Sequence, residues 1–299
     1  MTTQLSWAVI TPSYNLDFKR CALLCRSMDH FLTGSWHHYI VVDPVDLPLF
    51  AALAGPQRSV INKADILAKG MHFIGKVPFM RLGRVWWSWR HGLVFGWQMQ
   101  QIVKISMASY VKQDALAFWD SDVFFLKYFD IGNFARDKKI RFCCVKSEQK
   151  TEQSLMVNSV ALLGLSGMEV TKISNPDSIV TWHRKTAVAM QDYLAKLHQK
   201  PWHEAIGSKL MFSEYNLYML FVKFVQKSNP SLYQDNTLYC KTLWEEKGAR
   251  EIDVANFCSS LASEQVAVCF QSALGFDMGL LEQQLDRAIQ RHEKQLAKE

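Results

Sequence analysis

The sequence predicts an α/β fold in which a mostly parallel, Rossmann-type sheet is flanked by helices and followed by a helical C-terminal part. Residues 7–43 show the pattern strand, helix, strand, a spacing that implies parallel pairing and a right-handed crossover. Residues 115–119 are five consecutive apolar residues, the pattern of a strand buried on both faces. After about residue 150 helical patterns dominate.

Each element of this fold has its own signal. The first strand, 7–11, is broken by Pro12, and Asp17 begins the helix that follows. Further strands are expected at 38–43, 59–61, 141–145 and 266–270, and helices at 97–111 and 182–197 and from 201, 213 and 278. The basic segment 76–96 has weak periodicity, so we expect a long loop with one helical turn, and long structured loops are usually functional.

Composition and missing motifs exclude several classes of protein. A hydrophobic content of 49% and a charged content of 21% are typical of a folded chain, and no apolar run approaches the roughly 20 residues of a membrane-spanning helix. The N-terminal residues lack the parts of a signal peptide, and the seven cysteines lack zinc-type spacing, so we expect reduced thiols in a cytoplasmic protein. Walker and Gly-x-Gly-x-x-Gly loops, His-Glu-x-x-His and Gly-x-Ser-x-Gly are also missing.

Positive charge is concentrated in one interval. No acidic residue occurs between Asp65 and Asp114, and this interval contains seven lysines or arginines and four of the ten tryptophans. Its stretch 81–90 fits core packing, a loop that stacks on acceptor sugars through Trp87 and Arg90, or a patch that meets anionic lipid. Nucleic acid is not expected as a partner, because no recognisable module accompanies the pI of 8.9.

The strand at 115–119 ends in Asp120-Ser121-Asp122. Open α/β sheets bind ligands at the carboxyl ends of their strands, and two neighbouring carboxylates repel each other unless a cation joins them. Mg²⁺ or Mn²⁺ holding a substrate phosphate is the simplest occupant. The alternative is a turn whose acids accept hydrogen bonds from local backbone N–H groups.

Several short motifs occur in a fixed order over nearly the whole chain. They include Ile10-Thr11-Pro12-Ser13-Tyr14, Val41-Val42-Asp43, Gln100-Gln101 with Lys104, Trp119-Asp120-Ser121-Asp122-Val123, Thr181-Trp182, Phe212-Ser213-Glu214-Tyr215 and Gln271-Ser272. With this order and spacing the chain resembles a bacterial family of GT-A-like glycosyltransferases associated with surface-polysaccharide synthesis. The resemblance implies a GT-A-like domain over 1–276, with a nucleotide-binding half of about 1–150 and an acceptor-binding half of about 151–276. Residues 277–299 form an amphipathic helix.

The resemblance also implies a donor site. Asp122 binds the metal, while Asp120 contacts ribose or reaches the metal through water. Thr11 and Tyr14 follow the first strand, where this fold places the base, and Asp43 accepts a hydrogen bond from uracil N3–H. The plain alternatives are that Tyr14 packs locally and that Asp43 caps a turn before a proline.

Other residues are expected around the transferred sugar. Gln101 and Lys104 share a helix, where Lys104 offsets diphosphate charge or is simply a solvated surface lysine. Glu214, at the start of a helix, is the expected general base toward the acceptor hydroxyl, or only an acid that stabilises the helix start. Trp182 and His183 are candidate acceptor contacts, and His183 is alternatively a third metal ligand or a packing residue.

We therefore expect a metal-dependent glycosyltransferase of hexosyltransferase type. Its donor is a nucleoside diphosphate-sugar, UDP-linked in the simplest case, and its acceptor is a hydroxyl of a glycan or lipid-linked glycan. It would act in the cytoplasm, with peripheral contact at the inner face of the membrane left open. One alternative is a non-catalytic glycan- or membrane-binding protein on the same fold. A nucleotidyl- or phosphotransferase is a second, weakened by the lack of a glycine-rich phosphate loop.

Overall fold

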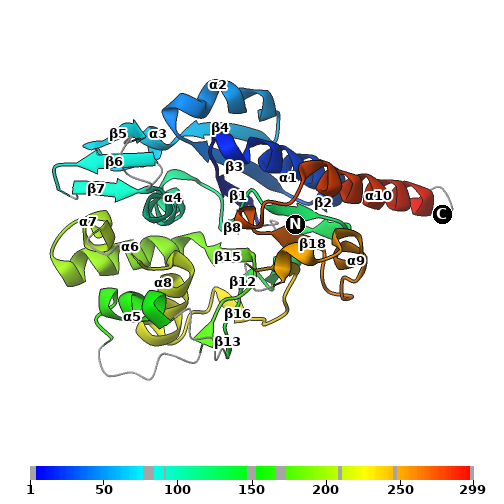
Figure 1. Cartoon of the computed structure of the whole chain (residues 1–299). Coiled ribbons are helices and arrows are strands. Elements are labelled where there is room, and N and C mark those ends of the chain that lie inside the picture. The colour runs from blue at the N-terminus through cyan, green and yellow to red at the C-terminus, as the bar shows by residue number, and fades with distance from the viewer. Residues whose placement is uncertain are drawn as a thin grey trace.

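A five-stranded sheet forms the centre of the protein (Figure 1). The computed structural model describes residues 5–76, 84–90, 92–146, 153–165, 173–207, 211–244 and 248–296. The strands stand in the order β15 (Ile179–His183), β8 (Ala115–Trp119), β1 (Trp7–Pro12), β3 (Trp36–Val42) and β4 (Arg58–Asn62). The last four are parallel, and β15 runs antiparallel at the edge. The expected α/β fold with a mostly parallel sheet is confirmed.

The order of the strands creates a switch point beside β1. From β1 the chain passes through α1 (Phe18–Phe31) to β3 and then to β4, all on one side. It later returns through α4 (Gly96–Tyr110) to β8 on the other side of β1. Loops that leave the carboxyl ends of β1 and β8 therefore turn in opposite directions, which opens a crevice of the kind where such sheets bind ligands.

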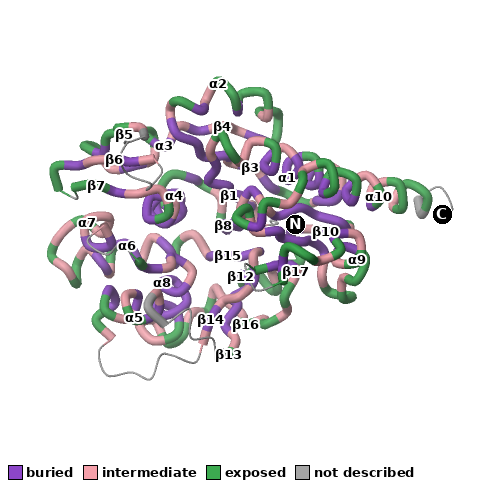
Figure 2. The backbone as a smooth tube through the Cα atoms, in the orientation of Figure 1, coloured by how far each residue is buried: buried purple, intermediate pink, exposed green. Residues whose placement is uncertain are grey.

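Two large hydrophobic cores lie on the two faces of this sheet, beside a smaller cluster around Phe50, and Figure 2 shows its inner strands as buried. Side chains alternate along each strand, so Ala8 and Ile10 join the core that contains α4, α6 (Arg184–His198) and α8 (Glu214–Leu220). Trp7 and Val9 join the other, with α1 and α10 (Met278–Leu296). Both faces of β1 and β8 are fully covered, which explains their uninterrupted apolar sequences.

The tryptophan-rich segment differs from our expectation of a long loop. It forms an antiparallel sheet of β5 (Met71–Lys76), β6 (Arg84–Ser88) and β7 (Gly92–Phe95), which follows α3 (Lys63–Ile66); residues 77–83 and 91 lie outside the described residues. Val85 and Trp86 are both buried although they are neighbours in β6, so the strand lacks the two-residue alternation that identifies strands in a sequence.

The C-terminal part contacts the first half of the chain in several places. Strand β18 (Ala267–Phe270) pairs with β9 (Val123–Phe125) and with β17 (Cys240–Leu243), and α10 packs on α1 and α9 (Val254–Ser259). The helix expected from 182 begins only at Arg184, because 179–183 are a strand. The two halves expected from the sequence therefore share sheets and cores.

The remaining elements are short. They are β2 (Leu32–Thr33), α2 (Leu47–Phe50), β10 (Phe129–Asp130), β11 (Ala135–Arg136), β12 (Lys139–Phe142), β13 (Val145–Lys146), α5 (Gln153–Leu162), β14 (Ile173–Ser174), α7 (Trp202–Gly207), a π-helix at Phe221–Gln226 and β16 (Leu232–Gln234).

All seven cysteines are buried free thiols, as expected. Among the described helices, none has the length and apolar character needed to span a bilayer.

Candidate active site

Two aspartates follow β8 at the switch point. The Asp120 side chain is half exposed, and its Oδ1 lies 2.9 Å from Lys104 Nζ. Asp122 turns toward the C-terminal strand, where its carboxylate accepts the backbone N–H of Ser272 at 3.2 Å and the thiol of Cys269 at 3.5 Å. The site therefore joins residues that are about 150 positions apart in the sequence.

The electrostatics of this carboxylate cluster favour a cation. Burial and the charge of Asp120 together raise the pKa of Asp122 to about 6, although the hydrogen bond from Cys269 and the charge of Arg20 oppose the rise. Burial also raises the pKa of Asp17, again with Asp120 adding to the rise and Arg20 opposing it. Arg20 is held in place because it donates to the carbonyl of Phe270 at 3.1 Å. Asp17 and Asp122 thus share one arginine and both feel the charge of Asp120, an arrangement that a hard divalent cation would stabilise.

Lys104 lies beneath Asp120 and is not the solvated surface lysine of the alternative prediction. Only 3% of its side chain is exposed, and Nζ lies 3.0 Å from Glu214 Oε1 and donates to the Tyr215 hydroxyl at 2.8 Å. Burial opposes the charge of Lys104, but Asp120 and Glu214 outweigh burial and raise its pKa well above the usual value. Gln101, one turn earlier on α4, accepts the backbone N–H of Glu214 at 3.1 Å. Both α4 residues thus hold the start of α8.

Glu214, the expected general base, is buried beside Lys104. Its side chain is 2% exposed, and burial raises its pKa while the ammonium of Lys104 opposes that rise. A base has to come within hydrogen-bond reach of the acceptor hydroxyl. In this arrangement Lys104 and Tyr215 stand around the carboxylate, so Glu214 contacts the site through Lys104.

A pocket of about 450 Å³ opens beside the aspartates, at the carboxyl ends of β1, β3 and β4. Tyr14 and Trp97 contribute aromatic rings to its wall, and Lys63 and Arg84 contribute cations. Asp17 and Ser272 also line it, which connects the pocket to the carboxylate cluster because Asp17 interacts with Asp120 and Ser272 donates to Asp122. The hydroxyl of Ser121 donates to that of Ser13, another lining residue, at 2.9 Å.

Asp43 lines this pocket but is already engaged by side-chain donors of the protein. Its Oδ1 lies 3.0 Å from Lys63 Nζ and accepts the indole N–H of Trp86 at 3.2 Å, while Oδ2 lies 2.7 Å from Arg84. Arg84 also pairs with the buried carboxylate of Asp46. Both oxygens of Asp43 thus hold the cations of the pocket wall, and the predicted hydrogen bond from uracil N3–H to Asp43 would share the carboxylate with these partners.

Three other predicted residues lie away from the pocket. Thr11 is fully buried and donates to the carbonyl of Trp119 at 2.7 Å, so it joins β1 to β8 instead of meeting a ligand. Trp182 is 1% exposed and stacks on Tyr218 with ring centroids 4.5 Å apart, which makes it a core residue. Because β15 is antiparallel to β8, His183 pairs with Ala115 at the opposite end of β8 from Asp120.

Trp87 lies in β6 and Arg90 in the turn that follows this strand, and neither lines the pocket. Trp87 packs edge-to-face on the exposed Trp89, with centroids 4.7 Å apart. Arg90 is largely exposed and pairs with Glu204 of α7 at 2.8 Å. The described structure therefore brings together Tyr14, Asp43, Gln101, Lys104, Asp120, Asp122 and Glu214, and leaves Thr11, Trp87, Arg90, Trp182 and His183 outside this group.

Sequence reasoning missed Arg20, Lys63, Arg84 and Cys269. One signal was available for Lys63, since it directly follows the third parallel strand and therefore stands at the carboxyl edge of the sheet. No sequence signal was available for Arg84 or Cys269. Arg84 pairs with Asp43, and Cys269 bonds to Asp122, only through tertiary contacts between distant segments.

Comparison with known proteins gives a match to one family model and likenesses to solved structures. A family model described as "Family of unknown function (DUF6492)" matches residues 5–290. Curated protein sequences give no match. Similar solved structures include an active-site mutant of LgtC, at 10% identity and TM-score 0.47 over 88% of this chain and 87% of that one. Mouse xyloside xylosyltransferase 1 in its apo form is similar at 9% identity and TM-score 0.47, over 91% and 100% of the two chains. Neither likeness bears on the role of any residue.

Proposed function

The chain belongs to the family of unknown function DUF6492, and we propose that it is a metal-dependent glycosyltransferase of GT-A type. It takes a sugar from a nucleoside diphosphate-sugar, UDP-linked in the simplest case, and transfers it to a hydroxyl of a glycan or lipid-linked glycan. One observation carries the proposal: a pocket with two aromatic rings and two cations adjoins a pair of aspartates at the switch point of a parallel sheet.

The pocket suits a nucleotide. A volume of about 450 Å³ lies within the range of small-molecule sites. The ring of Tyr14 is half-buried and that of Trp97 is 41% exposed, so both present surface to a flat ligand such as a base or a sugar. Ser272 and Asp17 lie on the side of the pocket nearest the carboxylates. A base in the pocket therefore directs its phosphates toward Asp120 and Asp122.

The two aspartates fit a divalent cation that is completed by substrate oxygens. Among the described residues no group of three or more His, Cys, Asp or Glu side chains is arranged to hold a metal, so the protein supplies two carboxylates. Mg²⁺ sites on phosphate substrates commonly use one or two. When bound, such an ion offsets the negative charge of the leaving diphosphate. Lys104 fixes the position of Asp120 and adds positive charge beside it.

The proposal places the donor mainly on residues of the first half of the chain. Residues 269–272 join them from the C-terminal half, whose other surfaces are left for the acceptor. Action in the cytoplasm fits the seven free thiols. A non-catalytic binding protein is the competing function, and the exposed Trp89, 85% accessible, is the observation that favours it.

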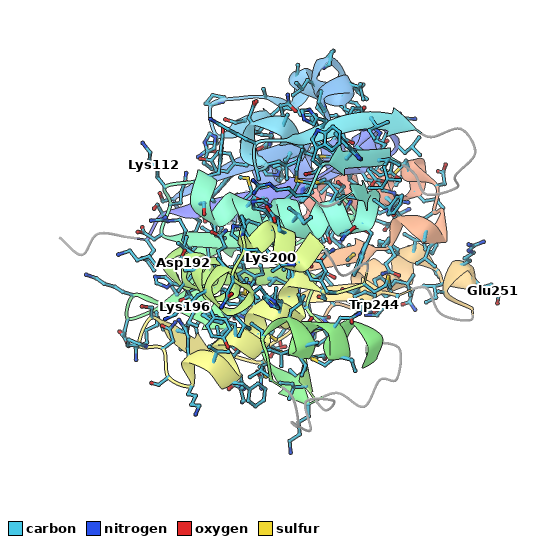
Figure 3. The ribbon with its side chains drawn as sticks, turned by 90° about the vertical axis from the view of Figure 1, so that its left-hand side faces the viewer. Lys112, Asp192, Lys196, Lys200, Trp244 and Glu251 are labelled. Atoms are coloured by element: carbon cyan, nitrogen blue, oxygen red, sulfur yellow. The ribbon has the colours of Figure 1, made fainter. Side chains whose placement is uncertain are left out.

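Thermal unfolding with a panel of nucleoside diphosphates and their sugars, each with Mn²⁺ and with EDTA, tests the proposal. A ligand at about 100 times its Kd stabilises the folded protein by roughly 2.7 kcal/mol. We expect one nucleotide to stabilise the wild type only with Mn²⁺, and Asp122→Asn to abolish the shift. The matched control is Asp192→Asn, which changes an exposed acid on α6 (Figure 3). Stabilisation without turnover of any donor sugar would favour the binding protein, and no stabilisation at all would reject the donor site.

A further inference from the structure

A second pocket, of about 420 Å³, lies between α1, α9, α10 and the segment that follows β9. It shares no lining residue with the donor pocket. Figure 1 shows α10 alongside α1, with α9 next to them. The proposed transferase chemistry uses none of these residues, so the pocket requires its own explanation.

The floor of this second pocket is apolar. Phe31, Leu126 and Ala288 line it and are almost completely buried, with exposures of 1%, 6% and 2%. Tyr128, 56% exposed, stands at its side and stacks on His292 with an angle of 18° between the rings. A ligand that fills the pocket therefore covers apolar and aromatic surface.

Basic side chains also line the same pocket. Lys127, Arg291 and His292 line it, and none of its described lining residues is acidic, whereas Asp17 and Asp43 line the donor pocket. Lys127 donates to the carbonyl of Ala262 at 2.6 Å, which leaves further ammonium hydrogens for a ligand.

Arg291 is the most informative of these residues. It has neither an ion pair nor a hydrogen bond within the described chain, whereas Arg26 on the neighbouring helix is paired with Asp286. An adjoining hollow of about 340 Å³ is also lined by Arg291, together with Arg287 one turn earlier. The acid of that hollow, Asp253, uses its carboxylate to cap α9. The guanidinium of Arg291 is therefore available to an external anion, and its planar fork suits phosphate or carboxylate.

From these observations we propose that this pocket binds an amphipathic anion: an apolar body rests on Phe31, Leu126 and Ala288, and a phosphate or carboxylate meets Lys127 and Arg291. The apolar floor excludes a bare inorganic ion as the preferred ligand, because such an ion would leave that surface uncovered. The basic rim excludes a neutral hydrocarbon, because the ligand would leave the cations unpaired. The inference is independent of the transferase activity.

Titration calorimetry of the full chain with hexyl phosphate tests this inference, with inorganic phosphate and hexanol as the two partial ligands. We expect one hexyl phosphate per chain, with each partial ligand at least about tenfold weaker, since a lost charged or apolar contact of about 1.4 kcal/mol corresponds to a factor of ten. EDTA and the Asp122→Asn substitution should leave the affinity unchanged, which separates this site from the donor site.

Two variants locate the site. Arg291→Glu reverses an exposed charge and should weaken hexyl phosphate at least about tenfold, while Lys196→Glu makes the same change on α6 and should have no effect (Figure 3). Ser259→Trp fills the mouth from an exposed position of α9 without altering charge, and should also weaken binding.

Several results would overturn the proposal. These are no binding of hexyl phosphate, equal binding to the Arg291→Glu variant, or equal affinity for inorganic phosphate. Phosphatidylglycerol vesicles provide the lipid form of the same chemistry. If the protein binds such vesicles but not hexyl phosphate, the pocket ligand is rejected in favour of a membrane-surface contact.

Discussion

At the scale of single residues, the site depends on carboxylates that the protein holds at a cost. Asp122 is surrounded by Cys269, Ser272 and the negative charge of Asp120, and its pKa is raised to about 6. The folded protein therefore binds a proton at Asp122 more tightly than the unfolded chain does between pH 3.8 and about 6. Above this range the ionised group opposes folding, and the full shift corresponds to roughly 3 kcal/mol.

The first prediction follows from the destabilising effect of the ionised Asp122. Asp122→Asn should increase the free energy of unfolding by about 1–3 kcal/mol at pH 8, where the wild-type carboxylate is ionised, and change it little at pH 4. Urea unfolding at the two pH values measures the difference, with Asp192→Asn as the exposed control. A loss of stability at pH 8 would show instead that the ionised Asp122 is a net stabilising group.

Glu214 and Lys104 provide a second prediction at this scale. Removing a general base typically slows an enzyme by about 10²–10⁴-fold. We expect Glu214→Gln to slow sugar transfer only about tenfold and to weaken donor binding, because the substitution loosens Lys104 without removing a group that touches the acceptor. Steady-state kinetics with separate kcat and KM values decide between the roles. A loss of 10³-fold in kcat with an unchanged KM for the donor would restore Glu214 as the base.

At the scale of elements, the small antiparallel sheet is joined to the central sheet by a buried ionic network. Arg84 at the start of β6 pairs with Asp43 after β3 and with Asp46, whose side chains are only 2% and 5% exposed. Trp86 adds a hydrogen bond from its indole to Asp43. The network holds the wall of the donor pocket between two sheets that have no strand in common.

The third prediction tests that network. Arg84→Ala should destabilise the protein by about 3 kcal/mol or more, because two buried carboxylates lose their shared partner. Arg26→Ala removes an arginine from an ion pair with Asp286 whose side chains are 52% and 45% exposed, and should cost less than about 1 kcal/mol. Chemical denaturation of both variants measures the contrast. Equal costs would mean that the Arg84 network is no more important than a surface pair.

Several elements could be predicted from sequence, and others could not, for physical reasons. Runs of apolar residues identified β1, β3, β8 and β18, and helical periodicity identified α1, α4 and α10. The sequence pattern did not identify β15. The antiparallel direction of this strand depends on its partner β8, and it places His183 away from Asp120. At the site, the position of Asp120 and Asp122 after β8 was foreseen, since it follows from strand order. The burial of Glu214 and the ion pairs of Asp43 could not be foreseen, since both depend on side chains from other elements.

At the scale of the whole molecule, one sheet separates two cores, and the last helix closes one of them. Leu281 and Leu285 of α10 are buried in the core that also contains Trp7 of β1 and Phe31 of α1. The C-terminal helix expected as an addition to a domain is therefore part of the main core. Its packing on α1 also forms one side of the second pocket.

The fourth prediction belongs to this scale. Leu285→Ala should lower the free energy of unfolding by about 2–5 kcal/mol and shift the circular dichroism and tryptophan fluorescence transitions together. Leu280→Ala, a 45% exposed neighbour on the same helix, should change stability by less than about 0.5 kcal/mol. If Leu285→Ala instead removes a separate early transition and leaves the main one unchanged, then α10 is an independent unit.

The bond between Ser272 and Asp122 has a consequence for synthesis. A chain emerging from the ribosome presents the four parallel strands β1, β3, β4 and β8 before residues 269–272 have been made. The hydrogen-bonding partners of Asp122 and Arg20 are residues 269–272, and Ser272 is made 150 positions after Asp122. Fragments that end before residues 269–272 would therefore lack these partners of Asp122 and Arg20.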